Sequence, residues 1–296
     1  MPAIRGSILL FMSGPSPSVL IGITTRNRAE ILPKALASAA AQDFPDKRTV
    51  VLDDASTDGT AGLRDSYPDV EWVRHEIPLG LRKNRNRMMQ YPGVDYFVSL
   101  DDDAWFIQDD EISIAVARME EDPTVGAIAF DILSPERPDI RERTAPGRCQ
   151  MFIGCGHVVR ISAARKVGWY DESPGPYGAE EKDLCLRLRD RGYHIEILPG
   201  VHVWHDKAWG GRDWYPLHKS GVCNDLVLAA RRYPFPDVLA VIPYKVVSHL
   251  RFGLKMRGLL RPALAGMMMF CRHLPGILVS RKPVKRCVIL ERIPPA

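Results

Sequence analysis

The chain places three consecutive carboxylates directly behind an apolar segment. Residues 96–100 read YFVSL, and Asp101, Asp102 and Asp103 come next. Like charges at adjacent positions repel one another, so this cluster favours a site that holds a positive group. Hard divalent cations take carboxylate oxygens and keep coordination positions for phosphate oxygens. One outer carboxylate suits a ribose hydroxyl, and the other suits a metal that bridges a diphosphate. In the simpler interpretation, one aspartate caps a helix and the other two are solvated.

A second acidic pair follows another apolar segment. Asp53 ends the run RTVVLD, and Asp54 opens the turn DASTDGT. Strand patterns alternate with helix patterns over the first hundred residues, which predicts a parallel sheet with right-handed crossovers. Ligands of such sheets bind beyond the carboxyl ends of the strands. Because both acidic clusters follow strands, we expect them to form one site.

The elements that must position these carboxylates follow from the apolar patterns. Strands are expected at 18–25, 48–53, 70–74 and 95–100, with helices at 30–42, around Leu63 and at 81–90. Asn27 is predicted to cap the first helix. Further strands are expected within a mixed region, including 150–160. Beyond it we predict a helix that ends before Gly192 and two short strands, at 195–198 and 201–204.

Charge divides the chain into two parts. Residues 1–215 carry 26 Lys and Arg against 33 Asp and Glu, and residues 216–296 carry 14 against 3. We expect an N-terminal extension at 1–17, an α/β domain at 18–215, and a basic, mostly helical region at 216–296. The six cysteines form no CxxC pair, as is typical of reduced thiols in a cytoplasmic protein. The apolar run 8–12 is too short for a signal peptide, and no segment reaches the roughly 18 apolar residues that span a bilayer.

Seven segments, in their order along the chain, resemble the motifs of the family 2 inverting glycosyltransferases, which have the GT-A fold. They are ITTRNR at 23–28, VVLDDASTDGT at 50–60, PLGLRKNRN at 78–86, SLDDDA at 99–104, VGWYDE at 167–172, GAEEKDLCLRLRDRGY at 178–193 and VHVWH at 201–205. Pro78 stands where the family usually has Asn. The resemblance implies a Rossmann-like, nucleotide-binding mixed sheet flanked by helices.

The resemblance also implies roles for individual residues. The implied nucleotide-sugar-binding residues are Thr24, Arg26, Asp53, Asp54, Arg82, Arg85, Asp101 and Asp102. Asp103 would bind Mg2+ or Mn2+, which neutralises charge on the leaving nucleoside diphosphate. His205 would contact the diphosphate or complete the metal shell, although a histidine beside Trp204 can also serve packing alone.

Inversion needs a base that takes a proton from the acceptor hydroxyl. The family usually has an Asp at the position that Glu181 occupies here, and Glu180 precedes it. Either glutamate is a candidate base, and both are also acidic first-turn residues favoured by the helix dipole. Gly154 and Gly156 would let the backbone approach the donor sugar, or relieve a bulge.

The basic C-terminal region contains two apolar stretches, at 238–250 and 259–272, with cations interleaved. Such helices can lie in an anionic membrane interface, and each is too short to cross a bilayer. The alternative is that they pack on the α/β domain and expose a basic face. No nucleic-acid partner is expected, because the region lacks an aromatic stacking pattern.

The sequence therefore predicts an inverting, metal-dependent glycosyltransferase. Its donor would be a nucleoside-diphosphate sugar and its acceptor a glycan, a lipid-linked sugar or a small natural product. The expected location is the cytoplasm, peripheral to the inner face of the plasma membrane. A sugar nucleotidyltransferase is the enzymatic alternative, although ITTRNRAE lacks the glycine-rich loop usual there. An inactive glycan- or membrane-binding scaffold is the alternative from another class.

Overall fold

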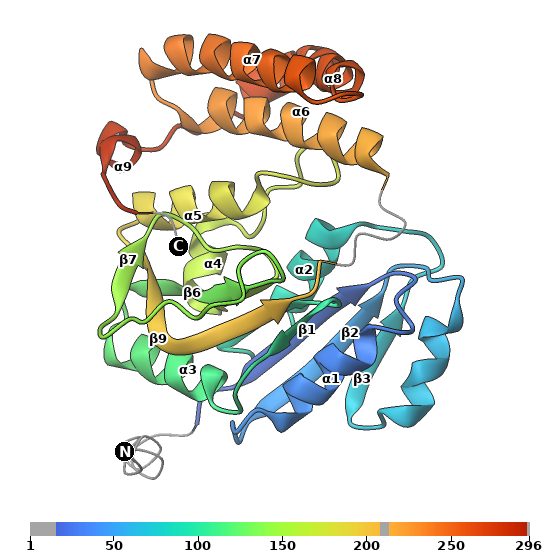
Figure 1. The fold of residues 1–296 in the computed structure, drawn as a ribbon. Helices are drawn as coiled ribbons and strands as arrows, with labels where there is room; N and C mark the ends of the chain where they lie inside the picture. The colour runs from blue at the N-terminus through green and yellow to red at the C-terminus, as the bar shows by residue number, and fades with distance from the viewer. Residues whose placement is uncertain (1–15, 208–212, 295–296) are drawn as a thin grey trace.

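The computed structural model describes residues 16–207 and 213–294. The apolar run 8–12 and most of the expected extension 1–17 lie outside the described residues. Figure 1 shows a sheet flanked by helices, with a separate layer of C-terminal helices stacked above it. The predicted α/β fold with a helical C-terminal region is confirmed.

The sheet contains nine strands in the order β3-β2-β1-β4-β8-β6-β9-β5, and β7 pairs with β9. Their bounds are β1 Val19–Thr25, β2 Lys47–Asp53, β3 Val70–Arg74, β4 Tyr96–Asp101, β5 Ala104–Phe106, β6 Val125–Leu133, β7 Gly147–Cys149, β8 Gly156–Arg160 and β9 His194–His205. The first four strands are parallel. Their register places Thr25 beside Asp53 and Thr24 beside Asp101, so the two acidic clusters end at one edge.

The other half of the sheet is mixed. Strand β8 runs antiparallel to β4 and β6, and β9 runs parallel to β6 but antiparallel to β5 and β7. Strand β9 is continuous, where two short strands were predicted. Its pairing with β6 shifts register near Asp131, and Gly200 adopts a φ of 77°, so the strand bends without ending.

Helices cover both faces of the sheet. Helices α1 (Leu32–Ala41) and α3 (Glu111–Glu121) pack on one face, and α2 (Leu81–Met89), α4 (Ile161–Val167) and α5 (Glu180–Asp190) on the other. Alternation along β1 explains this arrangement, because Ile21 and Ile23 belong to the first core and Leu20 to the second. Each face of a central strand is thus buried, as a parallel sheet requires.

Asn27 does not cap the first helix, which begins after Ile31. Its side-chain oxygen instead accepts a hydrogen bond of 2.7 Å from the backbone N–H of Thr57. The loop after β1 is thereby tied to the turn after β2. Asp58 caps the 3-10 helix Gly59–Ser66, which contains Leu63 as predicted.

The C-terminal layer consists of α6 (Trp214–Arg232), α7 (Asp237–Lys255), α8 (Leu260–Val279) and α9 (Arg286–Leu290). These helices have a core of their own, in which Leu226 and Phe270 are buried. Two ion pairs fasten α6 to the sheet domain: Arg231 to Asp171 at 2.7 Å and Arg232 to Asp183 at 2.5 Å. The two carboxylates belong to the loop before α5 and to α5 itself, so the upper layer is held by buried charge.

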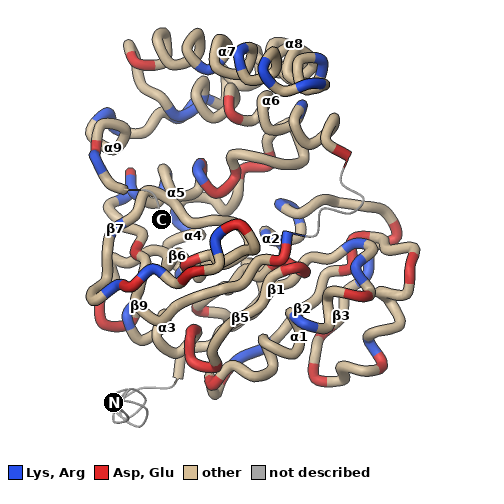
Figure 2. Tube along the Cα trace, viewed as in Figure 1, with Lys and Arg blue, Asp and Glu red and all other residues tan. Residues whose placement is uncertain are grey.

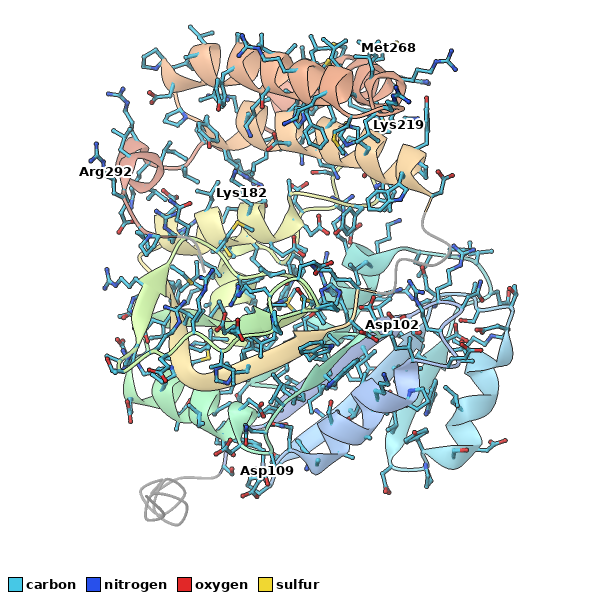
Figure 3. All side chains as sticks on the ribbon, viewed as in Figure 1. Asp102, Asp109, Lys182, Lys219, Met268 and Arg292 are labelled. Atoms are coloured by element: carbon cyan, nitrogen blue, oxygen red, sulfur yellow. The ribbon has the colours of Figure 1, made fainter. Side chains whose placement is uncertain are left out.

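Helix α8 corrects one expectation about the C-terminal region. It extends over 20 residues, and within the described ranges it is the one helix long and apolar enough to cross a membrane by length and composition. Core helices of soluble proteins meet the same criterion, and Ala263 and Phe270 of α8 are buried against the bundle. Its opposite side carries Met268, which lies at the outer surface in Figure 3 and is 71% exposed.

Candidate active site

A cavity of about 550 Å3 opens beyond the carboxyl ends of β1 and β4. Its floor includes Thr24, the three aspartates 101–103 and His205. Figure 3 labels Asp102 at these strand ends. The roof comes from α6 and α7 of the C-terminal layer. The cavity therefore lies between the acidic edge of the sheet and the basic region.

Asp101, Asp103 and His205 form a group that could hold a divalent metal. Their ligand atoms all lie within 4.8 Å of one another. Pairing of Ala104 with His205 across β5 and β9 brings the histidine to the aspartates. The Nε2 atom of His205 lies 3.1 Å from Oδ1 of Asp103, yet it is buried and makes no hydrogen bond within the part of the chain that the structure describes. An orphaned imidazole nitrogen beside two carboxylates fits a metal ion.

Asp102 has a pKa that is shifted by its burial and by the neighbouring charges. Burial raises its pKa to about 7, and the charges of Asp103 and Asp101 add to the effect. Arg28 opposes it, with its guanidinium 3.9 Å from the carboxylate. A cation bound at this edge would lower that pKa, which is why the three carboxylates are tolerable together.

Arg85 joins the acidic cluster to the candidate base. Its buried guanidinium donates to Oδ1 of Asp101 at 2.9 Å and to Oε1 of Glu181 at 3.0 Å. A third hydrogen bond of 2.8 Å reaches the carbonyl oxygen of Gly154. Although burial opposes the charge, Asp101 and Glu181 keep the pKa of Arg85 raised. One fixed cation therefore positions two carboxylates that have different predicted tasks.

Glu181 has the environment of a general base. Burial raises its pKa to about 7, with a further contribution from the charge of Glu180, and Arg85 opposes the shift. A base with a pKa near neutrality exchanges protons efficiently at physiological pH. Gly154 makes this arrangement possible, because a Cβ atom there would lie 2.3 Å from Oε1 of Glu181.

Glu180 points elsewhere. It is 2% exposed, and both carboxylate oxygens are buried without a hydrogen-bond partner in the described part of the chain. It lines a small internal cavity between α5 and α6, together with Arg82 and Arg231. Neither glutamate is among the described residues that line the large cavity, and of the two only Glu181 is linked to the acidic cluster, through the guanidinium of Arg85.

The second acidic pair organises loops. Oδ1 of Asp53 accepts a 2.8 Å hydrogen bond from the backbone of Ser56, and Arg74 lies 3.5 Å from its other oxygen. Asp54 accepts hydrogen bonds from the backbone N–H groups of Leu79 and Gly80, at 2.7 and 3.0 Å. Asp54 therefore fixes the segment that leads into α2, and neither residue lines the large cavity.

Three further predicted residues lie away from the cavity. Arg82 donates to the backbone carbonyls of Asp171 and Ser173, at 3.1 and 2.9 Å, and so holds the loop before α5. Arg26 is exposed and does not line the cavity. Gly156 lies within β8 in the core, where a Cβ atom would meet Ile132 at 2.9 Å. Its role here is close packing within the sheet.

Sequence patterns did not predict the residues that roof the cavity. They are Tyr177, Trp214, Leu217, His218, Gly221, Val222 and His249. Their positions reflect how α6 and α7 fold back over the strand ends, and local patterns carry little information about such contacts. The family resemblance could not find them either, since the matching segments end at 205.

A second group of ligand-type residues, Asp122, His194 and Glu196, lies apart from the cavity. Arg118 donates to both oxygens of Glu196, at 2.8 and 2.9 Å, and His194 lies 3.0 Å from the same carboxylate. These bonds satisfy the group as an ion-pair network between α3 and β9.

Comparison with known families agrees with this geometry. The model of glycosyl transferase family 2 matches residues 20–165, which span β1 to α4 and include both acidic strand ends. Residues 20–165 of the chain therefore belong to glycosyl transferase family 2, and the fold is GT-A.

Named relatives and solved structures are consistent with that assignment. The pre-mycofactocin glycosyltransferase of Mycobacterium tuberculosis is 28% identical over 232 residues, which cover 68% of this chain and 46% of that protein. The chain thus spans about half the length of this relative. A mannosyltransferase from Pyrobaculum calidifontis, in complex with GDP-Man and Mn2+, superimposes with a TM-score of 0.59 at 19% identity, over 88% of this chain and 76% of that one. Staphylococcus aureus TarS 1-349 with UDP-GlcNAc gives 0.63 at 14%, over 90% and 82%.

Proposed function

We propose that the chain is an inverting glycosyltransferase that uses a nucleoside-diphosphate sugar and a divalent metal. The observation that carries this proposal is the bond pair of Arg85, which links Asp101 of the candidate metal group to Glu181. One guanidinium thus holds both groups that a displacement reaction needs: a metal group for the leaving diphosphate and a base for the acceptor hydroxyl. Membership of glycosyl transferase family 2 supports the same reaction class.

On the donor side, Asp101, Asp103 and His205 would hold Mg2+ or Mn2+. When bound, the metal supplies Lewis-acid stabilisation of the departing diphosphate. Mn2+ in the structure of the Pyrobaculum calidifontis mannosyltransferase supports this choice of cofactor. Thr24, which lines the cavity with a buried and unpartnered hydroxyl, is suited to the nucleoside.

On the acceptor side, Glu181 would remove the proton from an acceptor hydroxyl. The oxygen then attacks the anomeric carbon from the face opposite the diphosphate, the new C–O bond forms, and the bond to the diphosphate oxygen breaks with its electron pair. The proton stays on Glu181 until solvent removes it. Arg85 keeps the carboxylate oriented during this step, since it holds Oε1 at 3.0 Å.

The acceptor classes that suit this chain are a glycan, a lipid-linked sugar and a small natural product.

The outer side of the C-terminal layer suits a membrane surface. Helices α7 and α8 expose Leu254 and Met268 on their outer side, and residues 238–279 contain no Asp or Glu. Figure 2 shows Lys and Arg distributed along these helices. Apolar and basic side chains together suit the anionic surface on the cytoplasmic side of a membrane. Sedimentation of the protein with anionic liposomes but not with neutral ones tests this location, and absence of any sedimentation at physiological salt would contradict it.

A thermal-shift panel tests the reaction class. UDP, GDP, dTDP and CDP are each added with and without Mn2+ to the native protein and to Asp103→Asn. A ligand that binds only the folded state raises Tm, and saturation at 100 times Kd stabilises by about 2.7 kcal/mol. We expect one nucleotide to stabilise the native protein only with Mn2+, and the variant to lose the effect. If no nucleotide stabilises the folded native chain, the inactive scaffold becomes the better description.

A further inference from the structure

The roof of the cavity contains two histidines on facing helices. His218 comes from α6 and His249 from α7, and both line the cavity whose floor carries Asp101 and His205. None of the motifs that define the family contains either residue. Side chains that converge on a reaction centre from a separate layer are candidates for contact with the second substrate.

His218 has an unused hydrogen-bonding atom. Its Nε2 is buried and has no hydrogen-bond partner among the described residues, while its ring packs against Phe252 with centroids 5.8 Å apart. Burial and the nearby His249 lower the pKa of His218, so the ring is neutral near pH 7. A neutral imidazole nitrogen pairs well with a hydroxyl, which can donate or accept, and gains less from an anionic phosphate.

His249 is held by the half-buried carboxylate of Asp225. Its Nε2 lies 3.0 Å from Oδ2 of Asp225, and Lys245 donates to the other oxygen at 2.5 Å. Although burial opposes ionisation, the hydrogen bond from His249 and the charge of Lys245 hold the pKa of Asp225 at about 2. The ionised carboxylate keeps the proton on Nε2 and leaves Nδ1 as the nitrogen for another partner.

The walls between the two histidines suit a sugar ring. Tyr177 and Trp214 line the cavity and are 48% and 52% exposed, and Leu217 adds an apolar side chain between them and His218 along the wall. A pyranose has apolar C–H faces and a rim of hydroxyls. Aromatic and aliphatic walls with a few fixed polar groups match that chemistry.

We propose that His218 and His249 form the acceptor subsite and bind hydroxyl groups of a pyranose ring. The inference rests on the proposed function, because it assigns the donor to the strand-end side of the same cavity. Asp225 acts as a positioning residue through His249. The roof thus determines which acceptor enters, and the floor performs the transfer.

Histidine-selective NMR tests this subsite on the full chain. The protein is labelled with 15N-histidine, and methyl pyranosides of glucose, galactose, mannose and N-acetylglucosamine are added to the complex with nucleotide and Mg2+, which is diamagnetic. We expect at least one pyranoside to shift the imidazole signals of His218 and His249. The exposed His273 on α8 provides an internal control that should not move.

Variants complete the test. His218→Phe keeps a packed ring but removes the nitrogens, and His218→Leu, which also lacks a hydrogen-bonding group, serves if the first variant melts early. Each should weaken pyranoside binding about three- to tenfold, as expected for one hydrogen bond, and His273→Ala should not. If no pyranoside shifts either signal, or if the nucleotide with Mg2+ alone accounts for the shifts, the proposal is wrong. Nucleotide binding that survives in these variants leaves the proposed function standing, whereas its absence from the native chain refutes that function.

Discussion

The floor and the roof of the cavity are built in different ways. The floor consists of side chains at strand ends, where Asp101, Asp103 and His205 are fixed by the register of the sheet. The roof consists of two helices that pack mainly on one another and on α8. Helix α6 reaches the sheet domain through the ion pairs of Arg231 and Arg232 and through Leu228, which packs against Leu186 of α5. The floor is acidic and the roof belongs to the basic region.

This difference shows where the chemistry and the selectivity are expected to lie. Groups that must hold a metal and a base within fractions of an ångström are attached to a rigid sheet. Groups that recognise a variable partner lie on elements whose internal packing is independent of that sheet. Four changes would test this division, beginning with the largest expected effect.

Replacement of Glu181 by Gln should abolish most turnover while nucleotide binding persists. A general base raises the rate about 10²- to 10⁴-fold, because without it no group takes up the proton of the acceptor hydroxyl in the transition state. Release of nucleoside diphosphate from the donor measures the rate. Glu180→Gln is the matched control, and its rate should stay within about tenfold of the native rate. A larger loss in Glu180→Gln than in Glu181→Gln would make Glu180 the base.

Gly154→Ala should cost about 100-fold in turnover, since a displacement of 1 Å at a reacting group has roughly that effect. The added Cβ would lie 2.3 Å from Oε1 of Glu181 and 2.9 Å from a guanidinium nitrogen of Arg85. Gly147→Ala is the control, because its Cβ would meet nothing closer than 3.9 Å. Native turnover in Gly154→Ala would show that the Arg85–Glu181 pair is not needed in its present position.

The pH dependence should follow Glu181. Its pKa is raised from 4.5 to about 7, so kcat/KM should fall about tenfold for each pH unit below 7, where the carboxylate is protonated. Because burial disfavours the charged form, the contribution to stability is greatest below 4.5 and is lost as pH rises towards 7. Glu181→Gln should remove the dependence of kcat/KM and weaken that of Tm, because burial also raises the pKa of Asp102 to about 7. Unchanged pH profiles of rate and Tm in that variant would assign the ionisation to another group.

The smallest effect concerns the outer side of the roof. Met268→Gln should change the free energy of unfolding by less than about 0.5 kcal/mol, because the side chain is 71% exposed. It should still reduce sedimentation with anionic liposomes if this side contacts a membrane. Phe270→Ala on the buried side is the contrast, with an expected loss of about 3 to 5 kcal/mol. Liposome binding that is equal in the native chain and in Met268→Gln would place the membrane contact elsewhere.

Much of the floor could be predicted from sequence. Strands β1 to β4 and helices α1 and α2 lie within about two residues of their expected positions, and α5 ends close to its expected end, because apolar periodicity and neighbouring turn residues define them locally. Strand β5 and helix α3 were not predicted. Ala104–Phe106 is too short to show a period, whereas α3 does carry the local signal of a helix, because its buried residues Ile112, Ala115, Val116 and Met119 stand at helical spacing.

Within the site, residue type was easier to predict than orientation. Glu180 and Glu181 are adjacent in sequence, yet helix geometry turns one towards an internal cavity and the other towards Arg85. Asp54 and Arg82 carry the charges that suit a nucleotide, but both side chains form hydrogen bonds with nearby backbone groups instead. Such competition depends on three-dimensional neighbours, and so does the position of His249, which lies more than 140 residues beyond Asp103.

The ion pairs that fasten α6 have an evolutionary consequence. Asp171 and Asp183 belong to segments that resemble motifs of the family, whereas His218 and Trp214 line the cavity from the same helix without belonging to any such segment. We expect the mode of attachment to persist across descendants of this chain while the cavity-facing positions diverge. Acceptor specificity would then change through substitutions on one side of a single helix, while the residues that perform the transfer stay the same.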